Sequence, residues 1–394
     1  MPAVSGGAAT AATVFLVALC LRPAITAVGP LLPRIGVDEG LGEAAQGLLG
    51  ALPLLAFAFV SPLVHRLSGR FGMERAVLGA LLVLAAGTVI RSWTGHAGLW
   101  VGTMVIGCAI AVGNVLVPAI VKRDYASNVS RATGFYTAFI TIAASTAAAV
   151  AVPIADAVDW RLSLAVWGGL ALAVAAAWLP RARRAATPET VAAPGDVALW
   201  RQPRAWMITA FMGLQSTCFY VLVTWMPTIE IAAGFPERVA GLHLFVFQGM
   251  GIVGGLTIPL LLRDYRTRPA GAVVASLPVI VAMLGLLAAP GLAAVWAAIA
   301  GLGQGAALVT ALTLISLGGR TAAETTRLSG MAQSLGYLFA AAGPVAAGIL
   351  AERTGAWHAT LIMVVVLGLA QIGAGILGSR PRAHRDPVPP IKMG

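Results

Sequence analysis

The stretch Leu19–Ile35, LCLRPAITAVGPLLPRI, decides the fold because it is an apolar run of membrane length that contains a charge. Arg22 lies near the middle of the surrounding apolar segment, which runs from about residue 11 to residue 33. About 20 apolar residues cross a bilayer as a helix, so the segment predicts a membrane span. An arginine at mid-depth costs roughly 2.5–3.5 kcal/mol on insertion scales. We therefore expect Arg22 to face the protein interior or a water-filled cavity.

The rest of the chain repeats this apolar pattern. Of its 394 residues, 59% are hydrophobic and 10% are charged, and the mean hydropathy is +0.88. A soluble domain carries about 25% charged residues. The apolar runs predict an all-α membrane protein with twelve transmembrane helices in two pseudo-symmetric six-helix bundles. The predicted spans are residues 10–34, 45–65, 76–94, 98–121, 133–155, 161–180, 205–229, 240–262, 271–290, 292–317, 328–351 and 357–378.

One long connector and an internal repeat predict two halves. The predicted domains are a first bundle at 1–180, a cytoplasmic linker at 181–203, a second bundle at 204–380 and a cytoplasmic tail at 381–394. Arg131 in RATG and Arg327 in RLSG are 196 residues apart, and so are Asp156 and Glu352. Duplicated halves with a binding site at their interface are typical of secondary transporters.

The basic residues predict the orientation of the chain in the membrane. The loops after even-numbered spans and the C-terminal tail hold 20 of the 26 lysines and arginines. Five lie in the opposite loops: Arg34, Arg91, Arg161, Arg238 and Arg353. Because cytoplasmic loops collect positive charge, both termini are expected in the cytoplasm. The net charge of +11 is spread over short loops, which argues against nucleic acid as a partner.

The stretch SPLVHRLSGRFGMER, residues 61–75, gives a first family resemblance. It resembles the G-x-L-A-D-R-x-G-R-R loop between spans 2 and 3 of the major facilitator superfamily, although His65 replaces the usual aspartate. The resemblance implies the fold of that family and a gating role for this loop. The gating residues it implies are Arg66, Arg70, Arg75 and, at the corresponding place in the second half, Arg263.

Four further stretches give a closer resemblance. They are LRPAITAVGPLLPRI, GNVLVPAIVKRDY, GLQSTCFYVLVTWMPTI and TRLSGMAQSLGYLFAAAGPVAAGIL, on predicted spans 1, 4, 7 and 11. Together they resemble the cyanate and 2-nitroimidazole transporter branch of the superfamily. The resemblance implies a bacterial permease for a small molecule and does not fix the substrate.

Arg22 is the leading candidate for substrate binding. No acidic residue falls in the middle of a predicted span, and Glu230 is assigned to an outer helix end or loop. Arg22 would then lack a fixed counter-ion at its own depth, and an anionic or polar substrate would satisfy its planar guanidinium. The alternative is a structural role in which Arg22 bonds backbone carbonyls freed by Pro23. Thr26 lies one turn further along and shares the face of Arg22.

Other polar and aromatic side chains within spans complete the predicted site. A buried amide or phenol in a membrane helix is expected to face another helix or a cavity. The additional substrate-binding candidates are Asn114, Tyr136, Gln215, Phe219, Gln304, Gln333 and Tyr337. Interhelical hydrogen bonding and packing are the alternative roles for all of them.

One histidine is a candidate for proton coupling. His243 lies near the outer end of span 8, where an imidazole can titrate, and an interfacial histidine is the alternative. No Cys or His cluster has the spacing of metal ligands, and GLGQG at Gly301 follows no strand. The sequence therefore predicts no metal and no cofactor.

These features predict a transporter that moves a small polar or anionic solute by alternating access, and no enzyme. Its expected partners are the small-molecule substrate and the lipid bilayer, and it is expected to work as a monomer. A multidrug efflux transporter on the same scaffold is the main alternative. A membrane sensor or an intramembrane enzyme is a more distant one, because the spans contain no candidate catalytic dyad.

Overall fold

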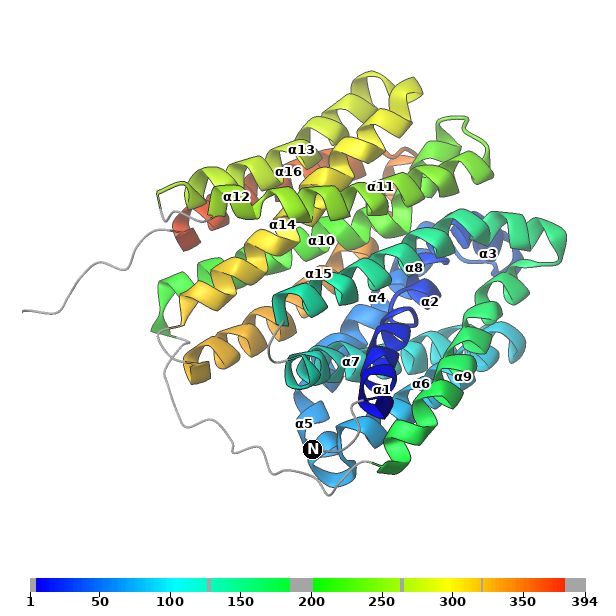
Figure 1. Ribbon diagram of the computed structural model, residues 1–394. Helices are drawn as coiled ribbons and strands as arrows, with labels where there is room; N and C mark the ends of the chain where they lie inside the picture. The colour runs from blue at the N-terminus through cyan, green and yellow to red at the C-terminus, as the bar shows by residue number, and fades with distance from the viewer. Residues whose placement is uncertain (1–4, 126–128, 185–200, 263–265, 320–321, 380–394) are drawn as a thin grey trace, which may run out of the picture.

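The computed structural model describes residues 5–125, 129–184, 201–262, 266–319 and 322–379, and every regular element in these ranges is helical (Figure 1). The first half contains α1 (Ser5–Ala18), α2 (Pro23–Thr26), η1 (Gly29–Leu31), α3 (Leu32–Glu39), α4 (Glu43–Val60), η2 (Ser61–Leu63), α5 (Val64–Phe71), α6 (Met73–Trp93), α7 (Gly95–Asp124), α8 (Val129–Ala157) and α9 (Trp160–Arg184). The second half contains α10 (Pro203–Ala232), α11 (Glu237–Thr257), α12 (Pro259–Leu262), α13 (Arg268–Ala288), η4 (Pro290–Leu292), α14 (Ala293–Gly318), α15 (Ala322–Thr354) and α16 (His358–Ser379).

The twelve predicted spans are confirmed. Within the described ranges, twelve helical segments are long and apolar enough to cross a membrane. Several run past their predicted limits: α7 covers 30 residues, whereas its predicted span was 98–121. Hydropathy marks the apolar centre of a helix, while the backbone hydrogen bonds continue into its polar ends. Most of the predicted linker 181–203 and all of the tail 381–394 lie outside the described residues.

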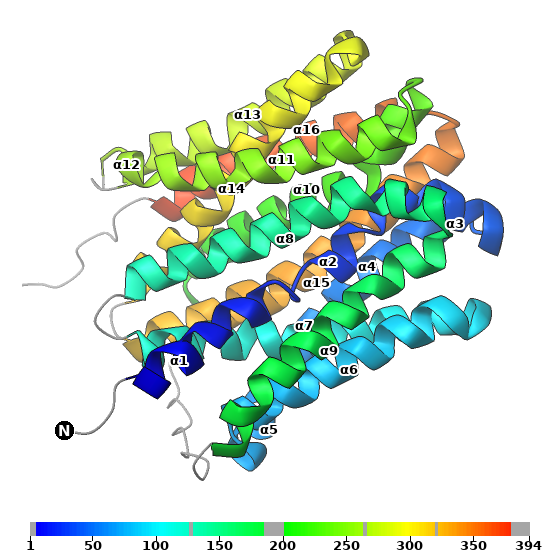
Figure 2. The same cartoon turned by 45° about the vertical axis from the view of Figure 1, so that its right-hand side comes forward.

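The two halves have matching internal packing. In the first half α6 packs against α7 and α9, and in the second half α13 packs against α14 and α16. Contacts between halves are made by α4 with α15 and by α8 with α11. Figures 1 and 2 show the halves side by side, and Figure 2 shows α3 at the opposite end of the bundle from the N-terminus. We call these two ends the α3 end and the N-terminal end.

Polar contacts join the halves at the α3 end, and they use the repeated acidic pair. Asp156, at the end of α8, accepts hydrogen bonds from Arg34 at 2.6 Å and from Arg238 of α11 at 2.7 Å. Glu352, at the end of α15, accepts a bond from the backbone N–H of Ala44 in α4 at 3.2 Å. Each carboxylate thus reaches the first turn of a helix in the other half, where the helix dipole favours negative charge.

Glycines allow α4 and α15 to approach closely at the same end. A Cβ on Gly47 would lie 2.3 Å from the Pro344 carbonyl oxygen, and one on Gly348 would lie 2.2 Å from the Glu43 carbonyl oxygen. Any side chain at either position would force the helices apart. The α3 end is therefore tightly closed between the halves.

Candidate functional site

The first span is broken at the residue that carries its charge. The sequence suggested a single helix, but α1 ends at Ala18 and α2 begins at Pro23, with turns and a bend between them. Pro23 has no backbone N–H and fixes its own φ, so it suits the first position of a new helix. Arg22 precedes this helix with φ −129° and ψ −35°, outside helical geometry. The break turns the Arg22 side chain toward the second half.

Arg22 contacts two aromatic residues of α10. Its Nη1 donates a hydrogen bond to the Tyr220 hydroxyl at 2.8 Å. Its Cζ lies 5.6 Å from the Phe219 ring centroid and 5.7 Å from that of Tyr220, within cation–π range. In the described part of the chain no carboxylate forms an ion pair with Arg22. Arg22 is partly exposed as a residue, and its guanidinium has one recorded hydrogen bond among the described residues, so donors remain for a further partner.

Tyrosines from two more helices complete an aromatic wall around this charge. Tyr136 of α8 and Tyr337 of α15 lie in the neighbourhood of the Arg22 guanidinium. The Tyr337 ring contacts Phe57 of α4 edge-on, with centroids 5.5 Å apart. We call Arg22, Tyr136, Phe219, Tyr220 and Tyr337 the Arg22 cluster. It brings together four predicted site residues and Tyr220, whose hydroxyl the sequence did not single out as a partner.

Two predicted site residues lie beside the break without contacting the guanidinium. The Thr26 hydroxyl is buried and lies 3.1 Å from the Ala144 carbonyl of α8, which also accepts a bond from Gln248 of α11 at 3.2 Å. Asn114 is partly exposed on α7. Its neighbour Gly113 packs closely against Leu21 of span 1. An ideal Cβ built on Gly113 would lie 2.4 Å from the Leu21 side chain.

The three predicted glutamines are engaged elsewhere or lack partners. Gln215 is buried and its Nε2 donates to Ser216 at 2.7 Å. Gln333 is half-buried and donates to Ser329 of the same helix at 2.9 Å. Gln304 is 4% exposed, and neither of its amide atoms has a hydrogen-bond partner among the described residues. None of the three has a recorded contact with Arg22 in these ranges, so their substrate role stays a prediction.

The predicted gating arginines are not members of the Arg22 cluster. Arg66 and Arg70 lie on the short helix α5, and Arg75 lies in the first turn of α6. All three are exposed, and Arg70 stacks on Phe71 with its Cζ 5.4 Å from the ring centroid. Arg263 lies outside the described residues. Their gating role is not tested by these contacts.

Glu230 lies at a helix end, as expected, but its side chain is buried. Helix α10 continues to Ala232, and Glu230 is 1% exposed. Its Oε2 lies 2.7 Å from Nδ1 of His243 in α11, and its Oε1 has no hydrogen-bond partner among the described residues. The sequence missed this pair because the predicted span ended one residue before the glutamate.

Arg91 was expected in an outer loop, and this expectation is wrong. It lies in the last turns of α6 and is 2% exposed. Its Nη1 donates to the Ala24 carbonyl at 2.6 Å and its Nη2 to the Leu164 carbonyl at 3.2 Å. Side chains lean toward the N-terminus of their helix, so an arginine near the C-terminal end points back into the bundle. Arg91, and not Arg22, bonds a carbonyl beside the break.

These features together define a class of protein. Two packed halves, twelve membrane-length helices and a discontinuous span with a charge at the interface are typical of secondary transporters. The sequence model of the Major Facilitator Superfamily matches residues 14–341. The chain therefore belongs to that family of transporters and is not an enzyme.

Relatives with assigned names support the branch predicted from the sequence. The chain is 38% identical to the 2-nitroimidazole transporter of Escherichia coli strain K12, over 95% of this chain and 96% of that protein. It is 25% identical to the cyanate transport protein CynX of the same strain, over 91% of this chain and 96% of that protein. The crystal structure of the nucleoside transporter NupG matches with a TM-score of 0.78 at 12% identity, over 94% of this chain and 99% of that chain. The last likeness concerns the fold alone.

Proposed function

We propose that this protein moves a small anionic or strongly polar solute across the bacterial inner membrane by alternating access, as a monomer with both termini in the cytoplasm. The observation that carries the proposal is Arg22, a partly exposed cation on a broken span without a carboxylate partner in the described residues. An intramembrane charge is usually functional. A planar acceptor such as a carboxylate, cyanate or nitro group matches the fork of the guanidinium.

The surroundings of Arg22 limit the size and kind of solute. Tyr136, Phe219, Tyr220 and Tyr337 approach from three helices that belong to both halves. Aromatic walls with a few polar anchors are typical of small-molecule sites. The names of the two Escherichia coli relatives, which concern 2-nitroimidazole and cyanate, agree with a small planar solute. In this proposal Arg22 supplies the charge and the tyrosines supply hydrogen bonds and shape.

The orientation follows from the distribution of charge. Arg66, Arg70, Arg123, Arg181 and many other basic residues lie toward the N-terminal end of the bundle, which we assign to the cytoplasm. The closed α3 end would then face the periplasm. In that state the substrate would reach Arg22 from the cytoplasm.

Uptake by purified protein in proteoliposomes tests the binding role. The panel is cyanate, nitroimidazoles and small carboxylates, and the variants are Arg22→Ala and Arg22→Lys. We expect Arg22→Ala to lower affinity roughly 10- to 100-fold, as loss of a charged hydrogen-bond pair predicts, and Arg22→Lys to retain part of it. Arg353→Ala is the control, because Arg353 is exposed at the α3 end. Binding that survives in Arg22→Ala would overturn the proposed site.

We infer further that protons drive transport and that the Glu230–His243 pair binds the coupling proton. The two side chains are buried in separate helices and share one short contact, so protonation of either changes the charge held between α10 and α11. A pH gradient should accelerate uptake by the wild type and not by Glu230→Gln or His243→Gln. Wild-type uptake that ignores the gradient would contradict this role.

A further inference from the structure

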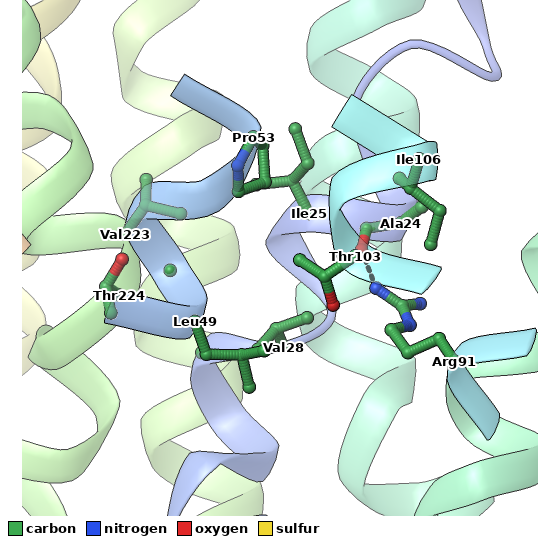
Figure 3. Close-up of a pocket in the computed structure, with 12 residues that line it drawn as sticks. Ala24, Ile25, Val28, Leu49, Pro53, Arg91, Thr103, Ile106, Val223 and Thr224 are labelled. Atoms are coloured by element: carbon green, nitrogen blue, oxygen red, sulfur yellow. Dashed lines mark hydrogen bonds between the residues drawn. The ribbon is translucent and has the colours of Figure 1, made fainter. Parts of the chain in front are cut away.

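A small cavity lies beside Arg91, away from the Arg22 cluster (Figure 3). Its volume is about 20 Å³. One water needs roughly 10–15 Å³, so the cavity holds one particle of water or halide size and excludes the solutes proposed for Arg22. Its polar lining side chains are Arg91, Thr103 and Thr224, and no acidic side chain lines it. Figure 3 shows Arg91 and Thr103 on one side and Thr224 on the other.

The protein satisfies the hydrogen-bond donors and the charge of the Arg91 guanidinium only in part. Two of its nitrogens donate to the carbonyls of Ala24 and Leu164, whereas Nε has no hydrogen-bond partner among the described residues. No ion pair joins Arg91 to a carboxylate in those ranges. Buried charges in proteins are normally paired or bound to an ion. Nε is closed off from the cavity, so a ligand there would bond the second N–H of Nη1 or Nη2, and the charge of Arg91 stays uncompensated.

The threonines distinguish an anion from a water. The Thr103 hydroxyl already donates to the Leu99 carbonyl at 2.7 Å. The Thr224 hydroxyl has no recorded hydrogen bond in the described chain, so it can donate into the cavity. A water would accept from a remaining N–H of Nη1 or Nη2 and leave the charge of Arg91 uncompensated. A monovalent anion compensates that charge and accepts from both Arg91 and Thr224.

We propose that this cavity binds one small inorganic anion of halide size between Arg91 and Thr224. Chloride is the abundant ion of that size and charge. The site is distinct from the solute site, because its lining includes none of the residues of the Arg22 cluster.

The cavity is built from both halves, which makes the anion sensitive to conformation. Val223 and Thr224 come from α10, and the remaining lining residues come from the first half. The walls meet closely where an ideal Cβ on Gly29 would lie 2.3 Å from the Val223 carbonyl oxygen and where one on Gly50 would lie 2.9 Å from Thr224. Separation of the halves at the α3 end would open the cavity. The anion should therefore bind preferentially to the closed α3 end and stabilise it.

A melting experiment on the purified full-length protein tests the proposal. Chloride or bromide replaces gluconate at constant ionic strength, and the melting temperature is followed as the halide increases. We expect the melting temperature of the wild type to rise steadily with the logarithm of the halide concentration above the Kd, because a ligand that binds only the folded state stabilises it in that way. Thr224→Val should raise the apparent Kd by roughly tenfold, as loss of one hydrogen bond to an ion predicts. Arg91→Gln should abolish the response.

A matched variant and a second measurement keep the test decisive if Arg91→Gln does not fold. Thr228→Val removes another buried hydroxyl of α10 that has no partner among the described residues and does not line the cavity. It should respond to halide like the wild type. A crystal grown in bromide should show an anomalous peak between Arg91 and Thr224. A melting temperature that ignores halide, or that rises equally in Thr224→Val, would overturn the proposal, as would a water in place of bromide.

Discussion

Replacing Gly47 by alanine should open the α3 end. The new Cβ would lie 2.3 Å from the Pro344 carbonyl oxygen, 2.9 Å from its carbon and 3.1 Å from the Val345 Cα. These are backbone atoms, so no side-chain rotation relieves the clash. An ordinary contact needs a separation of roughly 3.4 Å, so α4 and α15 must move about 1 Å apart, and such overpacking costs about 1–3 kcal/mol.

That cost applies only while the halves are packed together. Because α4 and α15 belong to different halves, opening the α3 end removes the clash and the strain with it. A bias of about 1–3 kcal/mol shifts a two-state equilibrium roughly 5- to 150-fold. The open state should gain population by that factor, and the fold within each half should be retained.

Cysteine labelling measures the shift. The reporter is Val223→Cys, at a residue of α10 that is 2% exposed, in a background where the native cysteines Cys20, Cys108 and Cys218 are alanine. A maleimide should react roughly 5- to 150-fold faster when Gly47→Ala is added. Gly249→Ala is the control, because a Cβ on Gly249 of α11 meets nothing within 4 Å. Equal rates in Gly47→Ala and Gly249→Ala would refute the view that this glycine contact holds the halves together.

The same reporter gives two related predictions, and a ligand assay gives a third. Gly348→Ala should open the α3 end as Gly47→Ala does, and the double variant should show less than the sum of both effects, because one separation of α4 from α15 relieves both clashes. Arg34→Ala removes a partly exposed pair with Glu237 across the halves and one with Asp156 within the first half, so labelling should rise at most a few-fold at low salt and hardly at all at high salt. Tyr220→Phe removes the acceptor that orients Arg22, so the affinity for a stabilising solute should fall roughly 3- to 10-fold in a thermal-shift titration. Unchanged affinity in Tyr220→Phe would show that this hydroxyl does not position the guanidinium.

The sequence predicts the number and place of the spans because hydropathy is a local property of each segment. It also predicts a mid-depth Arg22, since a charge within an apolar run is visible without any knowledge of packing. The break at Pro23 has a signal in the sequence, but apolar length alone does not separate a continuous helix from an interrupted one. The partner of Arg22 lies 198 residues away, and no periodicity links two helices at that distance.

The burial of Arg91 and Glu230, which the sequence did not predict, has a shared physical reason. Arg91 and Glu230 both lie near helix ends, where a count of loop charges treats a residue as outside the membrane. Whether such a side chain meets water depends on the direction in which it leaves the helix. Arg91 leans back toward Ala24, and Glu230 is covered by α11 through His243. These directions are set by neighbouring helices and are invisible to a window of apolar residues.

The distance along the chain between Arg22 and Tyr220 has a consequence for biogenesis. Translation proceeds at about 5–20 residues per second. The 198 residues between them therefore separate the two side chains by roughly 10–40 s at the ribosome. Arg91 follows 67 residues after Ala24, so the break in span 1 can be secured by the first half alone. The nascent first half must meanwhile hold the Arg22 guanidinium without its Tyr220 partner until α10 emerges.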